Sequence, residues 1–324
     1  MDRTGIILAA GDGRRLQPYI HRLRGDALPK QYVRFGGHRS LLEQTIRRAE
    51  LLIPPERLFT VVGWHHLAYR EAALQLADRP PGTVVIQPEN KETGPGILLP
   101  LIHLSARHPE SVVAIFPSDH HVVEASLFMG FVDLAVRMVE RDSTQLILLG
   151  IEPLAPDSEY GYILPGRRAT DGPGGVKQVV RFVEKPALDD AGELIGNGAL
   201  WNTFVMVAKA TALLELFRQL TPGLYRDFFR IRQAIGSGRE RAVTEEVYKV
   251  LEPFNFSKGV LGRIEPHDPL RVTVLPVRGV TWSDWGSEQR LLTGLEQLSE
   301  VNRINRHWTS NPPTSETGVA VEAN

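Results

Sequence analysis

The residues best suited to chemistry are cations placed close to a glycine turn. The apolar run Ile6-Ile7-Leu8 leads directly into Ala9-Ala10-Gly11-Asp12-Gly13-Arg14-Arg15, and Lys30 comes later, behind Pro29. Small residues let backbone N–H groups approach an anion closely, and cations beside them suit a polyphosphate. For this loop taken alone, a strand-to-helix turn with solvated arginines stays an open alternative.

Two better-known phosphate loops do not fit this stretch. A dinucleotide fingerprint, Gly-x-Gly-x-x-Gly, requires glycine where the chain has Leu16. A Walker A loop requires Ser or Thr after its lysine, whereas Gln31 follows Lys30. If the loop binds an anion, it therefore does so in another way.

A carboxylate follows a second apolar run. Asp119 comes directly after Val112–Phe116 in the segment Phe116-Pro117-Ser118-Asp119-His120. A carboxylate at the end of a buried strand is costly unless it binds a cation or caps a helix. Cation binding and helix capping both stay open for Asp119 at this point.

The periodicity of the apolar residues predicts the elements that position these side chains. One helix is expected to begin at Ser40, where a capping box starts, and to end before Pro54. Three more helices are expected over Leu67–Ala77, Gly96–Arg107 and Ser126–Glu140. They separate strands at Ile6–Leu8, Arg57–Gly63, Thr83–Gln87, Val112–Phe116 and Gln145–Gly150. This alternation predicts an α/β fold with a mostly parallel mixed sheet flanked by helices.

Polar clusters follow three of the predicted strands. They are Gly11–Arg15, Gln87–Asn90 and Ser118–His121. Ligands of such sheets bind beyond the carboxyl ends of the strands. We therefore expect all three clusters to open onto one edge of the sheet.

The second half of the chain has a different order of predicted strands and helices. Strands are expected at Tyr160–Ile163, Val176–Glu184 and Thr203–Ala208, and helices at Thr211–Leu220, Tyr225–Ile235 and Glu288–Asn302. We expect one domain over residues 1–308, with halves at about 1–150 and 151–290 that share the sheet. Residues 309–324 lack aromatic and basic side chains and are expected to form a disordered tail.

Five motifs in order resemble the sugar-1-phosphate nucleotidyltransferases, whose fold is Rossmann-like. Ala10 to Pro18 with Pro29-Lys30-Gln31 resembles their opening motif, and the Pro-Lys-Gln form is most similar to the mannose-1-phosphate guanylyltransferases among them. The other matches are Pro117-Ser118-Asp119-His120, Tyr160-Gly161-Tyr162-Ile163, Phe182-Val183-Glu184-Lys185-Pro186 and Trp282-Ser283-Asp284-Trp285-Gly286-Ser287. The resemblance covers roughly residues 4 to 290.

The resemblance implies roles for named residues. It makes Arg15, Lys30 and Asp119 catalytic, and assigns Mg²⁺ to Asp119 and Asp284. The nucleotide-binding residues that it implies are Ala9, Ala10, Gly11, Gly13, Arg14, Gln87, Asn90 and Thr93. Those that it implies for the sugar phosphate are Gly161, Glu184, Lys185 and Asn202.

The resemblance implies transfer of a nucleotidyl group from GTP to mannose 1-phosphate. Another hexose 1-phosphate or nucleotide stays open, because Trp201-Asn202-Thr203-Phe204 ends in phenylalanine where the family has glycine. The ring of Phe204 could fill sugar space or turn into the core. A non-catalytic sugar-nucleotide sensor is the third hypothesis; it would be expected to lack a metal or phosphate ligand, and none of them is missing.

Two other kinds of site are not expected. His65-His66 and His120-His121 are adjacent pairs, whose side chains diverge on a helix or a strand, so we expect no histidine metal site. No Gly-x-Ser-x-Gly nucleophile turn is present, which argues against a hydrolase triad.

Composition sets the remaining expectations. With 37 Lys and Arg against 38 Asp and Glu, the net charge of −1 does not favour nucleic acid or an anionic membrane as partner. The absence of cysteine excludes thiolate metal sites and disulfides. Lacking signal-peptide and membrane-spanning patterns, the chain is expected to be a cytoplasmic protein whose partners are a nucleoside triphosphate and a hexose 1-phosphate. A homodimer is the assembly considered.

Overall fold

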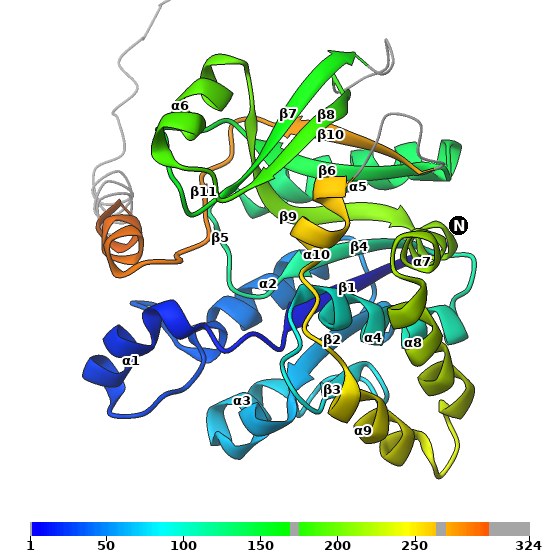
Figure 1. The fold of residues 1–324 in the computed structure, drawn as a ribbon. Helices are drawn as coiled ribbons and strands as arrows, with labels where there is room; N and C mark the ends of the chain where they lie inside the picture. The colour runs from blue at the N-terminus through cyan, green and yellow to red at the C-terminus, as the bar shows by residue number, and fades with distance from the viewer. Residues whose placement is uncertain (1, 169–174, 264–269, 298–324) are drawn as a thin grey trace, which may run out of the picture.

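The computed structural model describes residues 2–168, 175–263 and 270–297. Its centre is a nine-stranded sheet in the order β3-β2-β1-β4-β9-β6-β10-β8-β7 (Figure 1). The strands are β1 (Arg3–Ala9), β2 (Leu58–Gly63), β3 (Val84–Gln87), β4 (Val112–Pro117), β6 (Gln145–Ile151), β7 (Gly161–Arg168), β8 (Lys177–Glu184), β9 (Leu200–Lys209) and β10 (Arg271–Val277). A small second sheet pairs β5 (His121–Val122) with β11 (Trp282–Ser283).

The large sheet is mixed and mostly parallel, as predicted. Strands β3, β2, β1 and β4 run parallel, β6 and β10 are parallel to each other, and β9 is antiparallel to both β4 and β6. Together with the antiparallel partners of β8, these pairings give seven of the nine strands one direction, β8 and β9 being the exceptions. Strands from both halves of the chain therefore belong to one sheet.

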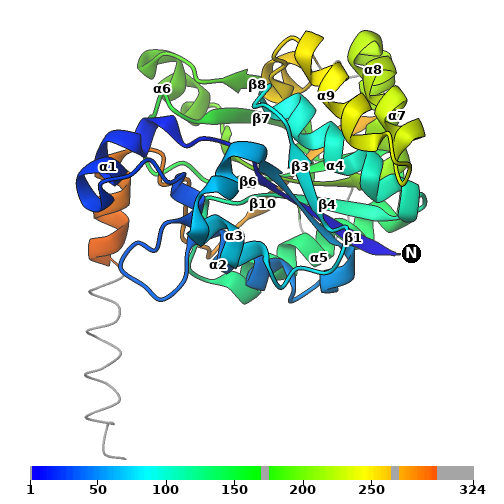
Figure 2. The same cartoon turned by 90° about the horizontal axis from the view of Figure 1, so that it is seen from below.

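Helices cover both faces of this sheet (Figures 1 and 2). On one face α2 (Leu41–Ala49), α3 (Arg70–Leu76) and α5 (Ala125–Arg141) pack against a core that contains Ile7, Ala114 and Phe116. The other core contains Ile6, Val113 and Ile115 and is covered by α4 (Thr93–Arg107), α7 (Ala210–Leu220), α8 (Pro222–Ala234), α9 (Glu240–Val250) and α10 (Phe256–Gly259). Neighbouring residues of each strand alternate between the two cores because successive strand side chains point to opposite faces.

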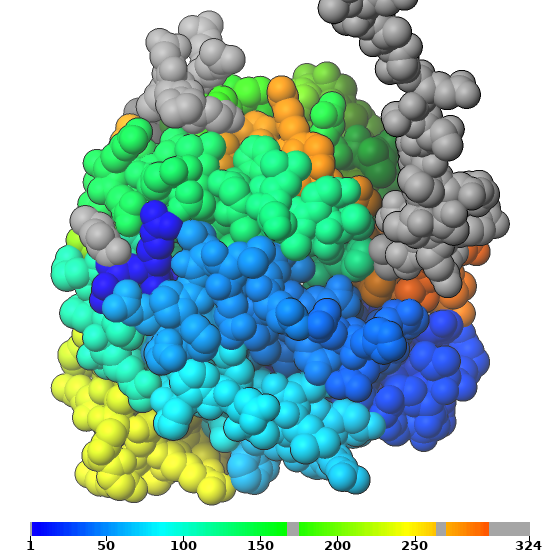
Figure 3. Space-filling model, turned by 180° about the vertical axis from the view of Figure 1, so that it is seen from behind, coloured from blue at the N-terminus to red at the C-terminus, as the bar shows by residue number. Residues whose placement is uncertain are grey.

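On the outer surface over α2 and α5, neighbouring segments of the chain pack against one another. Figure 3 shows blue and cyan segments of the first hundred residues meeting the green segment that contains α5.

None of the helices in the described part of the chain combines the length and apolar character needed to cross a membrane.

Two short elements lie at the carboxyl edge of β1. The chain leaves β1 through the glycine loop, forms a 3₁₀ turn at Arg14–Leu16, and enters α1 (Gln17–Arg24). Residues 288–297 are helical and lie beside α1, joined to it by an ion pair of 2.7 Å between Arg22 and Glu288. This contact brings the segment after β11 to the glycine loop.

Most predicted elements are present with small shifts in their bounds. The Ser40 side chain accepts a hydrogen bond from the Glu43 N–H, which confirms the capping box of α2. Helix α4 begins at Thr93 rather than Gly96, because Pro95 falls in the first turn, where an N–H has no partner within the helix. The predicted helix over Leu67–Ala77 is broken at Tyr69, whose backbone is extended, into a 3₁₀ turn at Trp64–Ala68 and α3.

Several elements were not predicted. The longer ones are α1, α6 (Leu188–Gly196), α9 and β10, and the short ones include β5, β11 and α10. The predicted tail at 309–324 and the end of the last predicted helix lie outside the described residues.

Candidate active site

The glycine loop after β1 is held in place by Lys30 and Gln31. Gly13 has φ +63°, and a Cβ there would lie 3.2 Å from Lys30 Cγ and 3.3 Å from Lys30 N, so the loop and the lysine fit together only with glycine. The Gln31 amide donates hydrogen bonds to the carbonyls of Ala9 (2.9 Å) and Gly11 (2.8 Å). Gln31, the residue that is incompatible with a Walker A loop, thus fixes the shape of this glycine loop.

Lys30 connects the two aspartates that were predicted to bind metal. Its side chain is almost completely buried, and Nζ lies 2.9 Å from Asp119 Oδ2. Nζ also donates to the main-chain carbonyl of Asp284 at 2.6 Å. Burial by itself raises the pKa of each aspartate, but Lys30 and other cations outweigh it and lower both pKa values below the ordinary range.

Asp284 lies at the centre of a network of donors. Oδ1 accepts hydrogen bonds from Tyr160 Oη (3.1 Å) and Gly286 N (2.9 Å) and lies 3.3 Å from Arg290 Nε. Oδ2 lies 3.3 Å from Arg15 Nη2. Arg15 also pairs with Glu159. Arg15, Lys30, Asp119 and Asp284, which come from four separate places in the sequence, therefore form one connected cluster.

The residues predicted for the sugar phosphate lie along the strands next to this cluster. Gly161 of β7 pairs with Glu184 of β8, and a Cβ on Gly161 would lie only 2.9 Å from Glu184 Oε2. The Lys185 N–H donates to the Tyr160 carbonyl at 3.1 Å. Asn202 of β9 is buried beside Trp201, whose ring is 4.5 Å from that of Tyr160. Tyr160 thus links these residues to Asp284.

Burial raises the pKa of the Glu184 carboxyl above its ordinary value, although Lys185, Lys258 and a hydrogen bond with Ser257 act in the opposite direction. A partly desolvated carboxylate beside two lysines can accept hydrogen bonds from hydroxyl groups.

Phe204, the main departure from the family motif, turns into the core. Its backbone has φ +56°, in the region that favours glycine, and the pairing of β9 with β6 is irregular at this point. The ring packs edge-on against Phe256 of α10, with 6.4 Å between the ring centres. The partly buried side chain therefore packs against the core beside α10, and its backbone is strained.

Five of the predicted nucleotide-binding residues line one cavity of about 230 Å³. They are Ala10, Gly11, Gln87, Asn90 and Thr93. The Gln87 amide nitrogen donates to the Glu89 carbonyl at 2.6 Å, while its buried Oε1 has no hydrogen-bond partner among the described residues. An unpaired buried acceptor is costly, so a bound group with an N–H would satisfy it.

Arg14 lies apart from that cavity. Its side chain is 87% exposed and pairs with Asp12 at 3.4 Å. It lines a neighbouring hollow of about 610 Å³ together with Asp12, His65 and Asn90.

The expectation that His65 and His66 diverge is wrong. Their ring centres are 4.3 Å apart, because both imidazoles turn toward the Asp12 carboxylate from the 3₁₀ turn after β2. Burial, and then the neighbouring His65, lower the pKa of His66 to about 4. His120 and His121 do diverge, one toward Trp282 and the other stacked on Trp285.

Comparisons with known proteins show the family of this chain. A sequence model described as nucleotidyl transferase matches residues 4–300. The chain belongs to the nucleotidyl transferase family.

Among curated relatives, the xanthan biosynthesis protein XanB of Xanthomonas campestris pv. campestris (strain B100) is 29% identical over 224 residues, which is 69% of this chain and 45% of XanB. The mannose-1-phosphate guanylyltransferase of Escherichia coli is 29% identical over 222 residues, 68% of this chain and 45% of that protein. The chain thus spans about half the length of the curated relatives that it matches.

Solved structures show the same nucleotidyl transferase fold. The structure described as mannose-1-phosphate geranyltransferase from Thermus thermophilus has a TM-score of 0.73 and 27% identity, and the match covers 88% of this chain and 77% of the other. UDP-glucose pyrophosphorylase complexed with UDP-glucose has a TM-score of 0.58 at 15% identity, covering 93% of this chain and 99% of the other, and supports the fold alone.

Sequence reasoning missed three residues of the cluster. Tyr160 and Gln31 were part of quoted motifs, but the Tyr160 hydroxyl and the Gln31 amide were given no role. Arg290 lies 2.7 Å from Asp157, and its guanidinium carbon is 4.5 Å from the centre of the Tyr160 ring. Its position three residues after the end of the Asp284 motif was the signal available.

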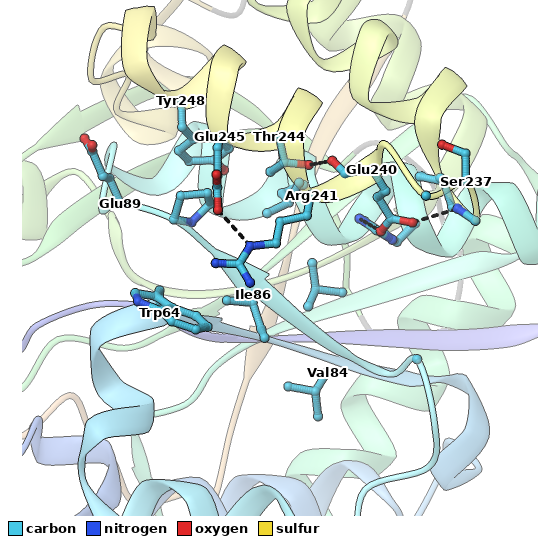
Figure 4. Close-up of a pocket in the computed structure, with 18 of the residues that line it drawn as sticks. Trp64, Val84, Ile86, Glu89, Ser237, Glu240, Arg241, Thr244, Glu245 and Tyr248 are labelled. Atoms are coloured by element: carbon cyan, nitrogen blue, oxygen red, sulfur yellow. Dashed lines mark hydrogen bonds and ion pairs between the residues drawn. The ribbon is translucent and has the colours of Figure 1, made fainter.

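A second large hollow, of about 880 Å³, lies on the outer side of the edge strand β3, against α9 (Figure 4). Among its charged groups, Arg241 pairs with Glu245 at 2.8 Å and lies over the Trp64 ring. None of the residues predicted for catalysis or for either substrate lines this hollow. This large hollow therefore does not coincide with the candidate site at the glycine loop.

Proposed function

We propose that this chain transfers a guanylyl group from GTP to mannose 1-phosphate, giving GDP-mannose and pyrophosphate. One observation carries the proposal: Lys30 contacts both Asp119 and Asp284, and Arg15 contacts Asp284, beside a glycine loop at the carboxyl edge of β1. Such a group of oriented charges suits a triphosphate better than a neutral ligand.

The reaction joins two anions. A phosphate oxygen of the sugar phosphate forms a bond to the α-phosphorus of GTP, and the bond from that phosphorus to the bridging oxygen of the β-phosphate breaks. Pyrophosphate leaves with the electron pair of that bond. The attacking oxygen is already anionic near neutral pH, so no side chain has to remove a proton.

The task of the protein is to offset repulsion. Two unit charges of the same sign at 4 Å repel by about 4 kcal/mol at an effective dielectric constant of 20. In this proposal Arg15 and Lys30 stabilise the charge of the triphosphate, and Lys185 stabilises that of the sugar phosphate. The nucleotide would occupy the half at 1–150 and the sugar phosphate the half at 151–290.

Asp119 and Asp284 have the donor chemistry that Mg²⁺ requires. Both carboxylates have lowered pKa values and are ionised at neutral pH, and Mg²⁺ prefers oxygen ligands and often takes only one or two carboxylates. These two residues would hold the ion, which supplies positive charge to the triphosphate when bound. Arg290 and Tyr160 keep the Asp284 carboxylate in position.

The choice of guanine and mannose has separate support. Gln87 Oε1 is a buried acceptor without a partner among the described residues, in the cavity beside the glycine loop, and it would accept from a base N–H. The curated relatives in Escherichia coli and Klebsiella pneumoniae are named mannose-1-phosphate guanylyltransferase. We place the reaction in the cytoplasm, where both substrates would meet the enzyme.

A pyrophosphate-release assay tests the proposal. The chain is incubated with Mg²⁺ and each of the four nucleoside triphosphates, paired in turn with mannose, glucose and galactose 1-phosphate. The expected result is the highest kcat/KM for GTP with mannose 1-phosphate. A higher value for another pair would replace the substrates and keep the reaction class, and release with no pair would favour a sensor.

A further inference from the structure

We propose that Asp12, His65 and His66 form a binding site for one divalent transition-metal ion, best suited to Zn²⁺. This site is separate from Asp119 and Asp284, and the proposal does not depend on the proposed substrates. It replaces the expectation, drawn from sequence spacing, that neighbouring histidines cannot share an ion.

The geometry of the three side chains carries the inference. Their ligand atoms all lie within 4.8 Å of one another. Asp12 Oδ1 is 2.8 Å from His65 Nε2 and 3.5 Å from His66 Nε2. Tetrahedral zinc with bonds of about 2.0–2.1 Å places its ligand atoms about 3.4 Å apart. Small side-chain movements would therefore be enough to admit the ion.

His66 supplies an independent observation. Its side chain is completely buried, and Nε2 makes no hydrogen bond with any described residue, because Asp12 at 3.5 Å lies beyond good hydrogen-bond geometry. A buried nitrogen without a partner is costly, and a metal ion would satisfy it.

The other nitrogen of His66 is already oriented. Nδ1 lies 3.3 Å from Tyr32 Oη, and Tyr32 Oη lies 3.4 Å from the Ala9 carbonyl. If Nδ1 carries the proton and donates to Tyr32, the lone pair of Nε2 points toward Asp12. Metal-ligating histidines generally have such an outer partner, which fixes the tautomer and the ring orientation.

The donor set determines which ion fits. Two imidazole nitrogens and one carboxylate oxygen suit Zn²⁺ better than Mg²⁺, which prefers oxygen ligands alone. Three protein ligands leave a fourth position for water or a solute. Asp12 and His65 line the 610 Å³ hollow, so this position is accessible from solvent.

A bound ion would tie the glycine loop to the turn after β2. Asp12 lies between Gly11 and Gly13, and the two histidines belong to the 3₁₀ turn at Trp64–Ala68. Occupancy of the metal site would thus restrain the loop that the proposed triphosphate contacts.

The test measures Zn²⁺ binding to the full, tag-free chain after treatment with a chelator. A chromogenic zinc indicator competes for the metal, and Co²⁺ in place of Zn²⁺ reports tetrahedral coordination by its absorption spectrum. We expect one ion per chain with Kd at or below about 1 μM, as in built sites with three protein ligands, and an increase in Tm on zinc addition.

Variants make the test specific. His65→Gln and Asp12→Asn should each weaken binding by at least about 100-fold and abolish the increase in Tm. His65 is half-exposed, so His65→Gln is expected to fold, and circular dichroism checks this. His38→Gln, at an exposed histidine outside the site, should bind zinc like the unmodified chain. Stoichiometry below roughly 0.2 ions per chain, or unchanged affinity in folded His65→Gln, would overturn the proposal.

Discussion

Replacing Lys30 by methionine tests the charge cluster on which the proposed reaction depends. Methionine has nearly the length of lysine and no charge, and it avoids the overcrowding that a larger side chain would cause against Gly13. The substitution removes the cation that contacts Asp119 and the donor to the Asp284 carbonyl. We expect a loss of both turnover and stability.

The structure sets the size of each loss. Removing one partner of a buried ion pair costs about 3–5 kcal/mol, but Asp119 is 31% exposed, so solvent screening should reduce the cost to roughly 1–3 kcal/mol. Removing one oriented charge-stabilising group usually lowers kcat by about 10²- to 10³-fold.

Adding Asp119→Asn separates the two effects. The double variant Lys30→Met with Asp119→Asn no longer contains a partly buried carboxylate without its cation, so it should be more stable than Lys30→Met alone. Its turnover should stay low, because both the phosphate cation and the metal ligand are missing. Lys209→Met, at the other end of the sheet, should keep normal turnover.

Pyrophosphate release at saturating substrate and urea unfolding measure the two quantities. Turnover of Lys30→Met within about threefold of the unmodified chain would refute the role of Lys30 in binding phosphate. A double variant no more stable than Lys30→Met would show that the contact with Asp119 is not what stabilises the fold.

Three further predictions concern other parts of the site. Arg15→Ala should lower kcat by at least about 10²-fold in the same assay, whereas Arg137→Ala on α5 should not. Glu184→Gln should be more stable than the unmodified chain at pH 8, because burial raises the pKa of Glu184 and its ionisation therefore opposes folding. Urea unfolding should show that this gain in stability becomes smaller as the pH falls toward the ordinary pKa of 4.5. Turnover of the variant should be lower at all pH values. Phe204→Gly should be more stable than Phe204→Ala by about 1–2 kcal/mol, because only glycine relieves the positive φ; equal or reversed stability would contradict the strain.

The sequence was sufficient for the parallel part of the sheet and for the edge where the site lies. Ile6 to Leu8 and Val112 to Phe116 are apolar runs bounded by turn residues, and buried parallel strands have this pattern. Because parallel strands end at one edge, the polar residues that follow β1, β3 and β4 were expected to open onto that edge. The contact of Lys30 with Asp119 brings a residue from the segment after α1 to the same edge.

The remaining parts depend on contacts between distant segments. Strand β10 is separated from its parallel partner β6 by more than a hundred residues, and no local pattern gives that pairing. Arg290 pairs with Asp157 from a distant segment as well as with Asp284, and this pairing was not visible in the sequence. The convergence of His65 and His66 likewise depends on Asp12, which comes from a different strand end.

Phe204 shows a limit of another kind. The family motif has glycine at this position, and the positive φ explains why glycine is suitable there. The sequence could not decide whether the phenylalanine ring enters the sugar site or the core. The contact with Phe256 decides for the core, so the substitution by itself does not argue against a sugar substrate.

A crystal structure with Mg²⁺ and a GTP analogue that resists cleavage between the α- and β-phosphates tests the central claim most directly. We predict that Lys30 Nζ and Arg15 lie within hydrogen-bond distance of phosphate oxygens, with Asp119 or Asp284 on the metal ion. A triphosphate bound elsewhere, with Lys30 still held by Asp119 and Asp284, would contradict the claim.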